Sequence, residues 1–247
     1  MQMTQFSALP TEIYLDNAAT TPIDERVKKA MEPYFSKLCG NPSSIHATGI
    51  RAQKALEQAR TTVARVLSCD PTEIIFTSGG TESINLALQG IARANKHSRK
   101  HIITTSIEHP AVLQTCDYLQ KNEGFEITYL DVDNYGSIKL EQLKQSIRDD
   151  TLLITIQYAN NEIGTIQPIA EIGKIARQHG IYFHTDACQA GTLLDLDVNK
   201  LNVDLLTLNG SKISAPAGTG ILYVNKKVQI APLLFDGGQE HGIRSGT

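Results

Sequence analysis

Short apolar runs alternate with amphipathic stretches along most of the chain. The apolar runs are rich in β-branched residues and bounded by turn residues, which is typical of strands buried on both faces of a parallel sheet. The predicted strands are residues 73–77, 101–105, 127–130, 152–157, 181–185, 205–208 and 220–224. So many short buried strands predict a central sheet.

The amphipathic stretches predict helices over residues 51–67, 82–94, 111–121, 140–147 and 169–179. In the first of them, one stripe at helical spacing holds Ala52, Ala55, Leu56, Ala59, Val63, Val66 and Leu67. Strands that alternate with helices predict an α/β fold with a mostly parallel sheet, right-handed crossovers and helices on both faces. Ligands bind such sheets outside the carboxyl ends of the strands, so the residues that follow each strand are the candidates for chemistry.

Composition sets limits on the class of protein. The 247 residues suffice for one large domain or two small ones. A net charge of −3 gives no reason to expect a nucleic acid or an anionic membrane as partner, no apolar run is long enough to span a bilayer, and no secretory signal is expected. The four cysteines are scattered without a C-x-x-C pair, which predicts neither a disulfide framework nor a metal site and favours a cytoplasmic location.

The first predicted strand leads through Ser78 and Gly79 into Gly80, Thr81 and a helix. Glycines let the backbone approach an anion, which the free N–H groups and the positive end of the helix dipole then hold. An ordinary turn before a helix has the same pattern, so this motif alone leaves phosphate binding open. The later Gly-Thr-Gly at 218–220 is weaker, because it precedes a strand and opens no helix.

Two further strand ends carry groups suited to a planar ligand. His109 follows the second strand, where an imidazole can stack on a cofactor and exchange protons near neutral pH. A loop or helix-capping histidine would look the same in the sequence. Asn160 and Asn161 follow the fourth strand and could fix a hydroxyl or a carboxylate, but Asn-rich turns are also common without function.

Asp186 and Lys212 follow the fifth and sixth predicted strands. The pair could be a simple salt bridge. Pyridoxal-phosphate (PLP) chemistry requires the same two groups, a lysine amine to form an imine with the cofactor aldehyde and a carboxylate to keep the pyridine nitrogen protonated. Taken in chain order with the glycine turn and His109, the pair favours PLP.

Several stretches resemble the cysteine desulfurases of the class V aminotransferase family. They are Tyr14-Leu-Asp-Asn-Ala-Ala-Thr-Thr-Pro22, Gly40-Asn-Pro-Ser-Ser-Ile-His46, Thr77-Ser-Gly-Gly-Thr-Glu-Ser83, Glu108-His109, Asn160-Asn-Glu-Ile-Gly-Thr165, His184-Thr-Asp-Ala-Cys-Gln189, Lys212 and Gly237-Gly-Gln-Glu-His-Gly-Ile-Arg-Ser-Gly-Thr247. The resemblance implies a three-layer PLP-dependent transferase fold of type I. Residues 1–247 would form the large, cofactor-binding domain, and residues 1–20 would pack with a C-terminal small domain that is largely absent from this sequence.

The resemblance also implies a role for each matching residue. These roles are imine formation by Lys212, pairing with the pyridine nitrogen by Asp186, ring stacking by His109, contact with the ring-hydroxyl side by Asn161 and Gln189, phosphate binding by Gly80 and Thr81, and contact with the phosphate of the partner subunit in a homodimer by Thr247. Where the family usually has Ser-x-His before the lysine, this chain has Asn209 and Ser211. Both can still donate hydrogen bonds to the cofactor, but the cation is lost.

The family's nucleophilic cysteine and the arginine that binds the substrate carboxylate are expected beyond residue 247. Cys188 lies beside Asp186 and Gln189, but a tight turn argues against its replacing a cysteine on a mobile loop. The leading interpretation is a cysteine desulfurase that converts L-cysteine to L-alanine and passes sulfur to an acceptor or scaffold protein, for iron–sulfur or other sulfur-transfer pathways. The alternatives are another class V lyase, such as a selenocysteine lyase, an aminotransferase, or a catalytically incomplete relic or dimerisation partner.

Overall fold

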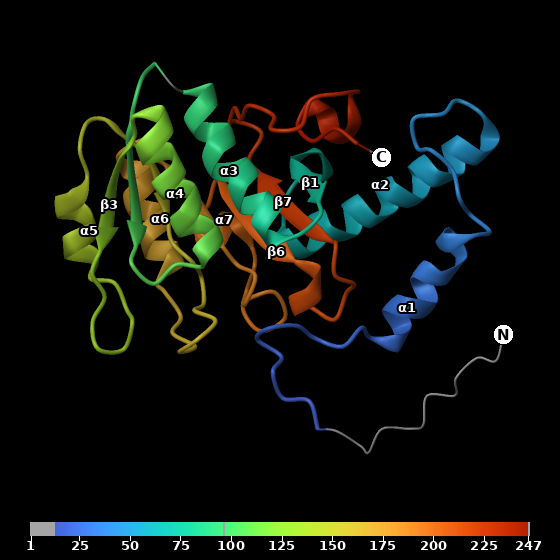
Figure 1. Ribbon diagram of the computed structural model, residues 1–247, viewed down its shortest axis with the longest axis horizontal. Coiled ribbons are helices and arrows are strands. Elements are labelled where there is room, and N and C mark those ends of the chain that lie inside the picture. Colours follow the sequence, from blue (N-terminus) through green and yellow to red (C-terminus); the bar gives the residue numbers. More distant parts are fainter. Residues whose placement is uncertain (1–12, 96, 247) are drawn as a thin grey trace.

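The computed structural model describes residues 13–95 and 97–246, and at its centre lies a mixed seven-stranded sheet (Figure 1). Its strands are β1 (Ile74–Thr77), β2 (His101–Thr105), β3 (Glu126–Leu130), β4 (Thr151–Thr155), β5 (Tyr182–Asp186), β6 (Leu205–Asn209) and β7 (Gly220–Val224). Their order across the sheet is β1-β7-β6-β5-β4-β2-β3. β7 runs antiparallel to β1 and β6, and the other neighbouring pairs are parallel. The prediction of a mostly parallel sheet is confirmed.

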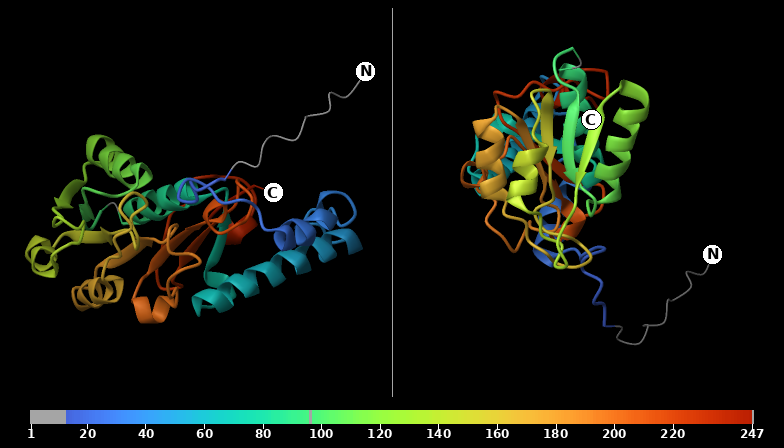
Figure 2. Two further views of the ribbon diagram at one scale, coloured as in Figure 1. Left: turned by 90° about the horizontal axis from the view of Figure 1, so that it is seen from below. Right: turned by 90° about the vertical axis from the view of Figure 1, so that its left-hand side faces the viewer.

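Helices cover both faces of the sheet and make three layers (Figure 2). One face carries α3 (Gly80–Ala94) and α4 (Pro110–Glu123), and the other carries α2 (Ala47–Leu67), α5 (Leu140–Ser146), α6 (Ile169–Gln178) and α7 (Val198–Leu201). Successive strand residues point to opposite faces. Ile75 and Leu153 therefore belong to the core under α3 and α4, whereas Ile74 and Ile154 belong to the opposite core.

The predicted strands were expected to be apolar on both faces, and β5 departs from this. His184 is fully buried between two threonines of the neighbouring strands, with Nδ1 2.8 Å from Thr155 Oγ1 and Nε2 3.0 Å from Thr207 Oγ1. Burial lowers the pKa of His184 to about 3, so the ring is neutral. A buried polar side chain is tolerated here because both of its ring nitrogens are hydrogen-bonded.

Most predicted elements are present with shifted ends. β4 ends at Thr155 rather than at residue 157, and α2 begins at Ala47 rather than at residue 51. The earlier start follows from the His46 side chain, which accepts a hydrogen bond from the Gly49 N–H at 3.2 Å and so caps the helix. The elements that the sequence pattern did not predict are α1 (Glu25–Met31), α7, and the 3₁₀ turns η1 (Glu32–Phe35), η2 (Pro71–Glu73), η3 (Gly210–Lys212) and η4 (Gln239–Gly242).

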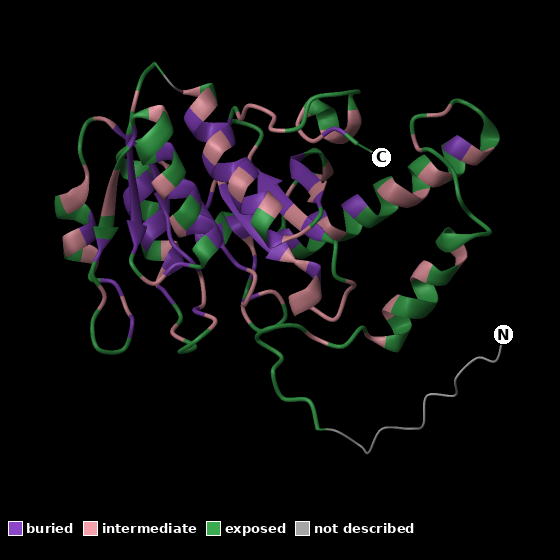
Figure 3. Cartoon of the chain, viewed as in Figure 1, coloured by how far each residue is buried: buried purple, intermediate pink, exposed green. Residues whose placement is uncertain are grey.

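An arm made of α1, η1, the loop at residues 36–46 and the first half of α2 extends away from the three-layer body (Figures 1 and 3). α1 has no buried residue. Large exposed apolar side chains gather on the arm, namely Tyr34, Phe35, Leu38, Ile45 and Ile50. None of the described helices is long and apolar enough to cross a membrane. An apolar surface of this kind is typical of a protein–protein contact.

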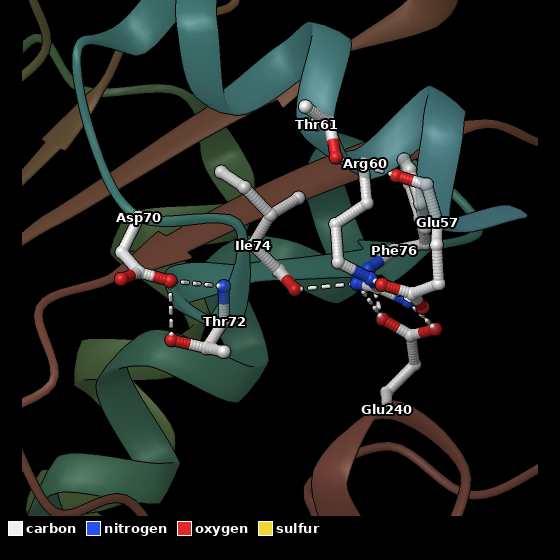
Figure 4. Close-up of polar contacts among 8 residues, drawn as sticks. All are labelled: Glu57, Arg60, Thr61, Asp70, Thr72, Ile74, Phe76 and Glu240. Atoms are coloured by element: carbon white, nitrogen blue, oxygen red, sulfur yellow. Dashed lines mark hydrogen bonds and ion pairs between the residues drawn. The ribbon is translucent and has the colours of Figure 1, made fainter.

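A buried ion pair joins the C-terminal segment to α2 and β1 (Figure 4). Arg60, which is 2% exposed, donates from Nη1 and Nη2 to the Glu240 carboxylate, each at 2.8 Å. Nη1 also donates to the Ile74 carbonyl at 2.6 Å, and the guanidinium lies 4.9 Å from the centroid of the Phe76 ring. The Phe76 N–H donates to the same carboxylate at 2.8 Å. Glu240 has φ +45°, a left-handed conformation that costs roughly 1–2 kcal/mol, so these bonds stabilise a strained turn.

We expect Glu240→Gln to lower the free energy of unfolding by about 3 kcal/mol, because it removes the buried one of the two carboxylates that pair with the buried Arg60 guanidinium. Glu57→Gln is the matched control, since Glu57 pairs with the same Arg60 at 3.2 Å from a half-exposed position. The control should cost less than about 1 kcal/mol. Urea denaturation of both variants measures the difference, and equal losses would contradict the dominance of the buried pair.

Candidate active site

The carboxyl edge of the sheet surrounds a cavity of about 400 Å³. The residues predicted from the sequence that line it are Gly80, Thr81, His109, Asn161, Asp186, Gln189, Asn209 and Lys212. Ser211 lies next to the cavity without lining it, and its hydroxyl donates to Asn209 Oδ1 at 3.3 Å. Thr247 lies outside the described residues. Segments far apart in the sequence therefore converge on one site.

The β1–α3 turn presents backbone donors at one end of this cavity. The N–H groups of Gly80, Thr81 and Glu82 find no acceptor in the described part of the chain, and they open a helix of 15 residues. A Cβ at Gly80 would lie 2.8 Å from Cys188 Sγ and 3.7 Å from Asn209 Nδ2, so a larger residue would have to displace its neighbours. The turn can bind an anion with these N–H groups, the Thr81 hydroxyl and the Asn209 amide as donors.

Glu82 fixes this turn from its outer side. Its carboxylate accepts from the Ser78 N–H at 2.7 Å and from Arg244 Nε at 2.8 Å. Burial by itself would raise the pKa of Glu82, but the hydrogen bonds from Arg244 and Ser78 lower it overall. The guanidinium offsets a negative charge that would otherwise repel an anion in the turn.

His109 caps a helix and also lines the cavity. Its Nδ1 accepts from the Ala111 N–H at 3.0 Å, at the start of α4. In the neutral ring the proton is therefore on Nε2. The helix-capping interpretation is confirmed, and it leaves the ring at the cavity wall, where it can stack on a planar ligand.

Glu108 ties the His109 turn to the end of β4. It is 4% exposed, and its Oε1 accepts from the Thr105 hydroxyl at 2.7 Å. Its two oxygens lie 3.1 and 3.0 Å from the Gln157 backbone nitrogen, whose N–H donates to them. Burial raises the pKa of Glu108 to about 8 although these bonds lower it, and the charge of Asp186 adds to the rise. Apart from the family-like Glu108-His109 pair, no pattern in the sequence assigned Glu108 this position.

Asp186 ends β5, and Lys212 ends η3, the turn that follows the neighbouring strand β6. Asp186 is 7% exposed, and its Oδ1 accepts from the Cys188 N–H at 3.0 Å. Lys212 Nζ donates to the Ala18 carbonyl at 2.6 Å and to the Ala19 carbonyl. The ion pairs among the described residues do not include one between Asp186 and Lys212, so the simple salt-bridge alternative is wrong. Both side chains line the cavity and can face a ligand.

Sequence reasoning missed part of the cavity wall. The additional lining residues are Asp16, Ala18, Ala19, Ile84, Gln157, Ala159, Glu162 and Cys188, the last weighed only as a replacement nucleophile. Residues 16–19 form no helix or strand, so periodicity could not find them. Their one signal was the family-like stretch at residues 14–22. The predicted packing of residues 1–20 with a small domain stays a prediction, and residues 1–12 lie outside the described chain.

Burial suppresses the reactivity of three of the four thiols, those of Cys69, Cys116 and Cys188. Burial, together with the charge of Asp186, raises the pKa of the Cys188 thiol well above its ordinary value. Burial also raises the pKa of Cys69 and of Cys116 to about 12. Buried protonated thiols are poor nucleophiles. Within the described ranges, no three His, Cys, Asp or Glu side chains gather to hold a metal ion.

Known proteins match this chain over nearly all of its length. Residues 13–245 match the family Aminotransferase class-V. Cysteine desulfurase IscS of Methanosarcina thermophila is 54% identical over 235 residues, which cover 95% of this chain and 58% of that protein. The mitochondrial cysteine desulfurase of Candida albicans is 50% identical over 238 residues, which cover 95% of this chain and 49% of that protein.

The solved structure of SspA in complex with cysteine has a TM-score of 0.92 at 45% identity, covering 95% of this chain and 68% of that one. The likeness confirms the predicted three-layer fold of the PLP-dependent transferases. This chain spans only 58% and 49% of the length of the two curated relatives. With a match that runs through its whole described core, the chain belongs to the class-V aminotransferase family.

Proposed function

We propose that this chain is the cofactor-binding part of a PLP-dependent cysteine desulfurase. One observation carries the proposal: a single cavity joins the anion-binding turn at Gly80 and Thr81 to His109, Asp186 and Lys212. The phosphate, the flat ring, the ring nitrogen and the aldehyde of PLP each need a different partner. The chemistry of these side chains offers one for each.

The phosphate would bind at the start of α3. Gly80 and Thr81 offer unpaired N–H groups and a hydroxyl there. Asn209 Oδ1 accepts from the Ser211 N–H and hydroxyl, both at 3.3 Å, and Nδ2 on the same amide lies near Gly80, where it could donate to a bound phosphate. Ser211 thus assists the phosphate through Asn209.

The remaining residues would hold the ring and move protons. His109 stacks on the ring, Asp186 holds the proton on the pyridine nitrogen, and Asn161 and Gln189 contact the ring-hydroxyl side. The amine of Lys212 would hold PLP by its aldehyde group, and the same amine would remove or return the proton at the α-carbon of the substrate. When bound, PLP supplies the electron sink for that carbon.

The proposed substrate is L-cysteine, with L-alanine as product and persulfide sulfur passed to an acceptor or scaffold protein. The similarity to cysteine desulfurases and to SspA, which was solved with cysteine, supports this choice. Another class V lyase or an aminotransferase is the runner-up, and an exchanged amino group in place of alanine and persulfide would identify it. We place the protein in the cytoplasm, because all four cysteines are free, as in a reducing compartment.

PLP should attach covalently to Lys212. Borohydride reduction after incubation with excess PLP should place a pyridoxyl group on this residue, as peptide mapping would show. Lys212→Ala should lose the adduct, whereas Lys227→Ala, which changes an exposed lysine, should keep it. An adduct elsewhere in the wild-type chain, or none, would refute the assignment.

We also propose a homodimer with shared sites. Thr247 and the loop at residues 40–46 match family segments at the interface, and the exposed apolar arm supports the same surface. Light scattering at micromolar concentration should show a dimer. Ile45→Asp, at a position 95% exposed in the single chain, should shift it toward monomer, whereas Leu193→Asp, 81% exposed on another part, should not. A wild-type monomer at every concentration would contradict the proposal.

The 247-residue chain on its own should not form alanine from cysteine, even with PLP bound. Cleavage of the carbon–sulfur bond needs a thiolate placed at the substrate sulfur, and placement contributes about 7–11 kcal/mol of barrier lowering. Cys188 is fixed in a turn with a raised pKa. Alanine and sulfide would be measured together with a reductant present. Stoichiometric alanine that Cys188→Ser abolishes would show Cys188 to be the nucleophile, and alanine that survives removal of all four thiols would overturn the persulfide mechanism.

A further inference from the structure

The N-terminal segment, defined as residues 16–24, runs alongside the loop that carries Lys212 (Figure 1). It contains no helix or strand. Its Thr21 N–H donates to the Ser211 carbonyl at 2.7 Å, and the Ser214 carbonyl accepts from the last N–H of the segment at 3.0 Å. The segment therefore binds the loop on both sides of the lysine.

The hydroxyl of Thr21 bridges the same two positions. It donates to the Ser211 carbonyl at 3.0 Å and accepts from the Ser214 N–H at 2.7 Å. Ser214 has φ +58°, a left-handed conformation that is unfavourable for residues other than glycine. In the described part of the chain, no other side chain bonds to the backbone on both sides of Lys212. This half-buried hydroxyl therefore fixes the turn from which the lysine side chain leaves.

The same segment also holds the amine of Lys212. Nζ donates to the carbonyls of Ala18, at 2.6 Å, and Ala19, and Gln189 Nε2 donates to the Ala18 carbonyl at 3.0 Å. Carbonyl oxygens only accept hydrogen bonds, so they hold the amine by its protons. The segment thus fixes both the backbone conformation around Lys212 and the position of its amine.

We propose that Thr21 is a positioning residue for Lys212, which keeps the amine aimed into the cavity through its hydroxyl bridge. The consequence for cofactor attachment rests on the proposed function. In that step the neutral amine leaves the Ala18 and Ala19 carbonyls and condenses with the aldehyde, forming a carbon–nitrogen double bond and releasing one water. The position of the bridge does not depend on that step.

A first experiment tests the bridge without PLP. Reductive methylation with formaldehyde and cyanoborohydride, followed by mass spectrometry across a range of pH, compares Lys212 with the exposed Lys227 as internal reference. Thr21→Val removes the hydroxyl at nearly constant shape and should raise the relative labelling of Lys212 about fivefold, the factor that one net hydrogen bond contributes. Thr21→Ser keeps the bridge and should label like the wild type.

Thr20→Val is the matched control, because exposed Thr20 makes one long bond to the Ser211 carbonyl at 3.4 Å. It should label like the wild type. Thermal melts monitored by circular dichroism verify that each variant is folded. If the valine variant does not fold, the labelling of the serine variant is compared with that of the wild type alone. Labelling of Lys212 that is the same in Thr21→Val as in wild type, or a serine variant that behaves like the valine variant, would overturn the proposal.

A second experiment follows cofactor attachment. Absorbance on mixing with PLP, with borohydride trapping at Lys212, should show attachment slowed about tenfold or more in Thr21→Val, since small misplacements of a reacting group are costly. Thr21→Ser and Thr20→Val should match the wild type. If neither the wild type nor any variant attaches PLP at Lys212, the proposed function is wrong. The labelling experiment still decides the role of Thr21 in that case. Attachment in Thr21→Val at the wild-type rate would count against positioning.

Discussion

The register of the antiparallel strand β7 brings the two halves of the site together. Its first residue, Gly220, pairs with Thr77 at the end of β1 and with Asn209 at the end of β6. A Cβ at Gly220 would lie 2.5 Å from both Gly79 Cα and Thr77 Oγ1, so the strands approach this closely only around glycine. β1 leads into the turn at Gly79 and Gly80 that we propose to bind phosphate, and β6 leads to Lys212. The register of β7 therefore sets the distance between the proposed phosphate site after β1 and the Lys212 amine after β6.

Much of this arrangement could be predicted because it is encoded locally. Apolar runs gave the strands, and the carboxyl-end rule directed attention to the residues after them, such as Asp186 and Lys212. The same local pattern was ambiguous for the Gly-Thr-Gly at 218–220, which had been weighed as a weak anion site. Its structural use is packing, because Gly220 admits the neighbouring strand end. A glycine motif alone cannot show whether a ligand or another backbone makes the close approach.

The features that escaped prediction depend on partners far apart in the sequence. Arg60 and Glu240 are separated by 180 positions, and neither has a neighbour that marks it as half of a buried pair. Thr21 lies 190 positions from Ser211, in a segment without periodicity. Only the resemblance to a family singled out residues 14–22 and the C-terminal stretch. Periodic patterns in the sequence predict helices and strands. Long-range hydrogen bonds and ion pairs, which such patterns do not show, determine where the irregular segments pack against those helices and strands.

Burial of Glu108 changes the charge at the carboxyl edge of the sheet. Because burial raises its pKa from 4.5 to about 8, the folded state keeps a proton that the unfolded state loses across that range. The stability that this group contributes is full below pH 4.5 and is lost as the pH rises through about 8. Near neutral pH the mostly protonated carboxyl still accepts from the Thr105 hydroxyl and the Gln157 N–H. The His109 turn is thereby tied to β4 without a second negative charge directly beside Asp186, the carboxylate that we propose to face a ring nitrogen.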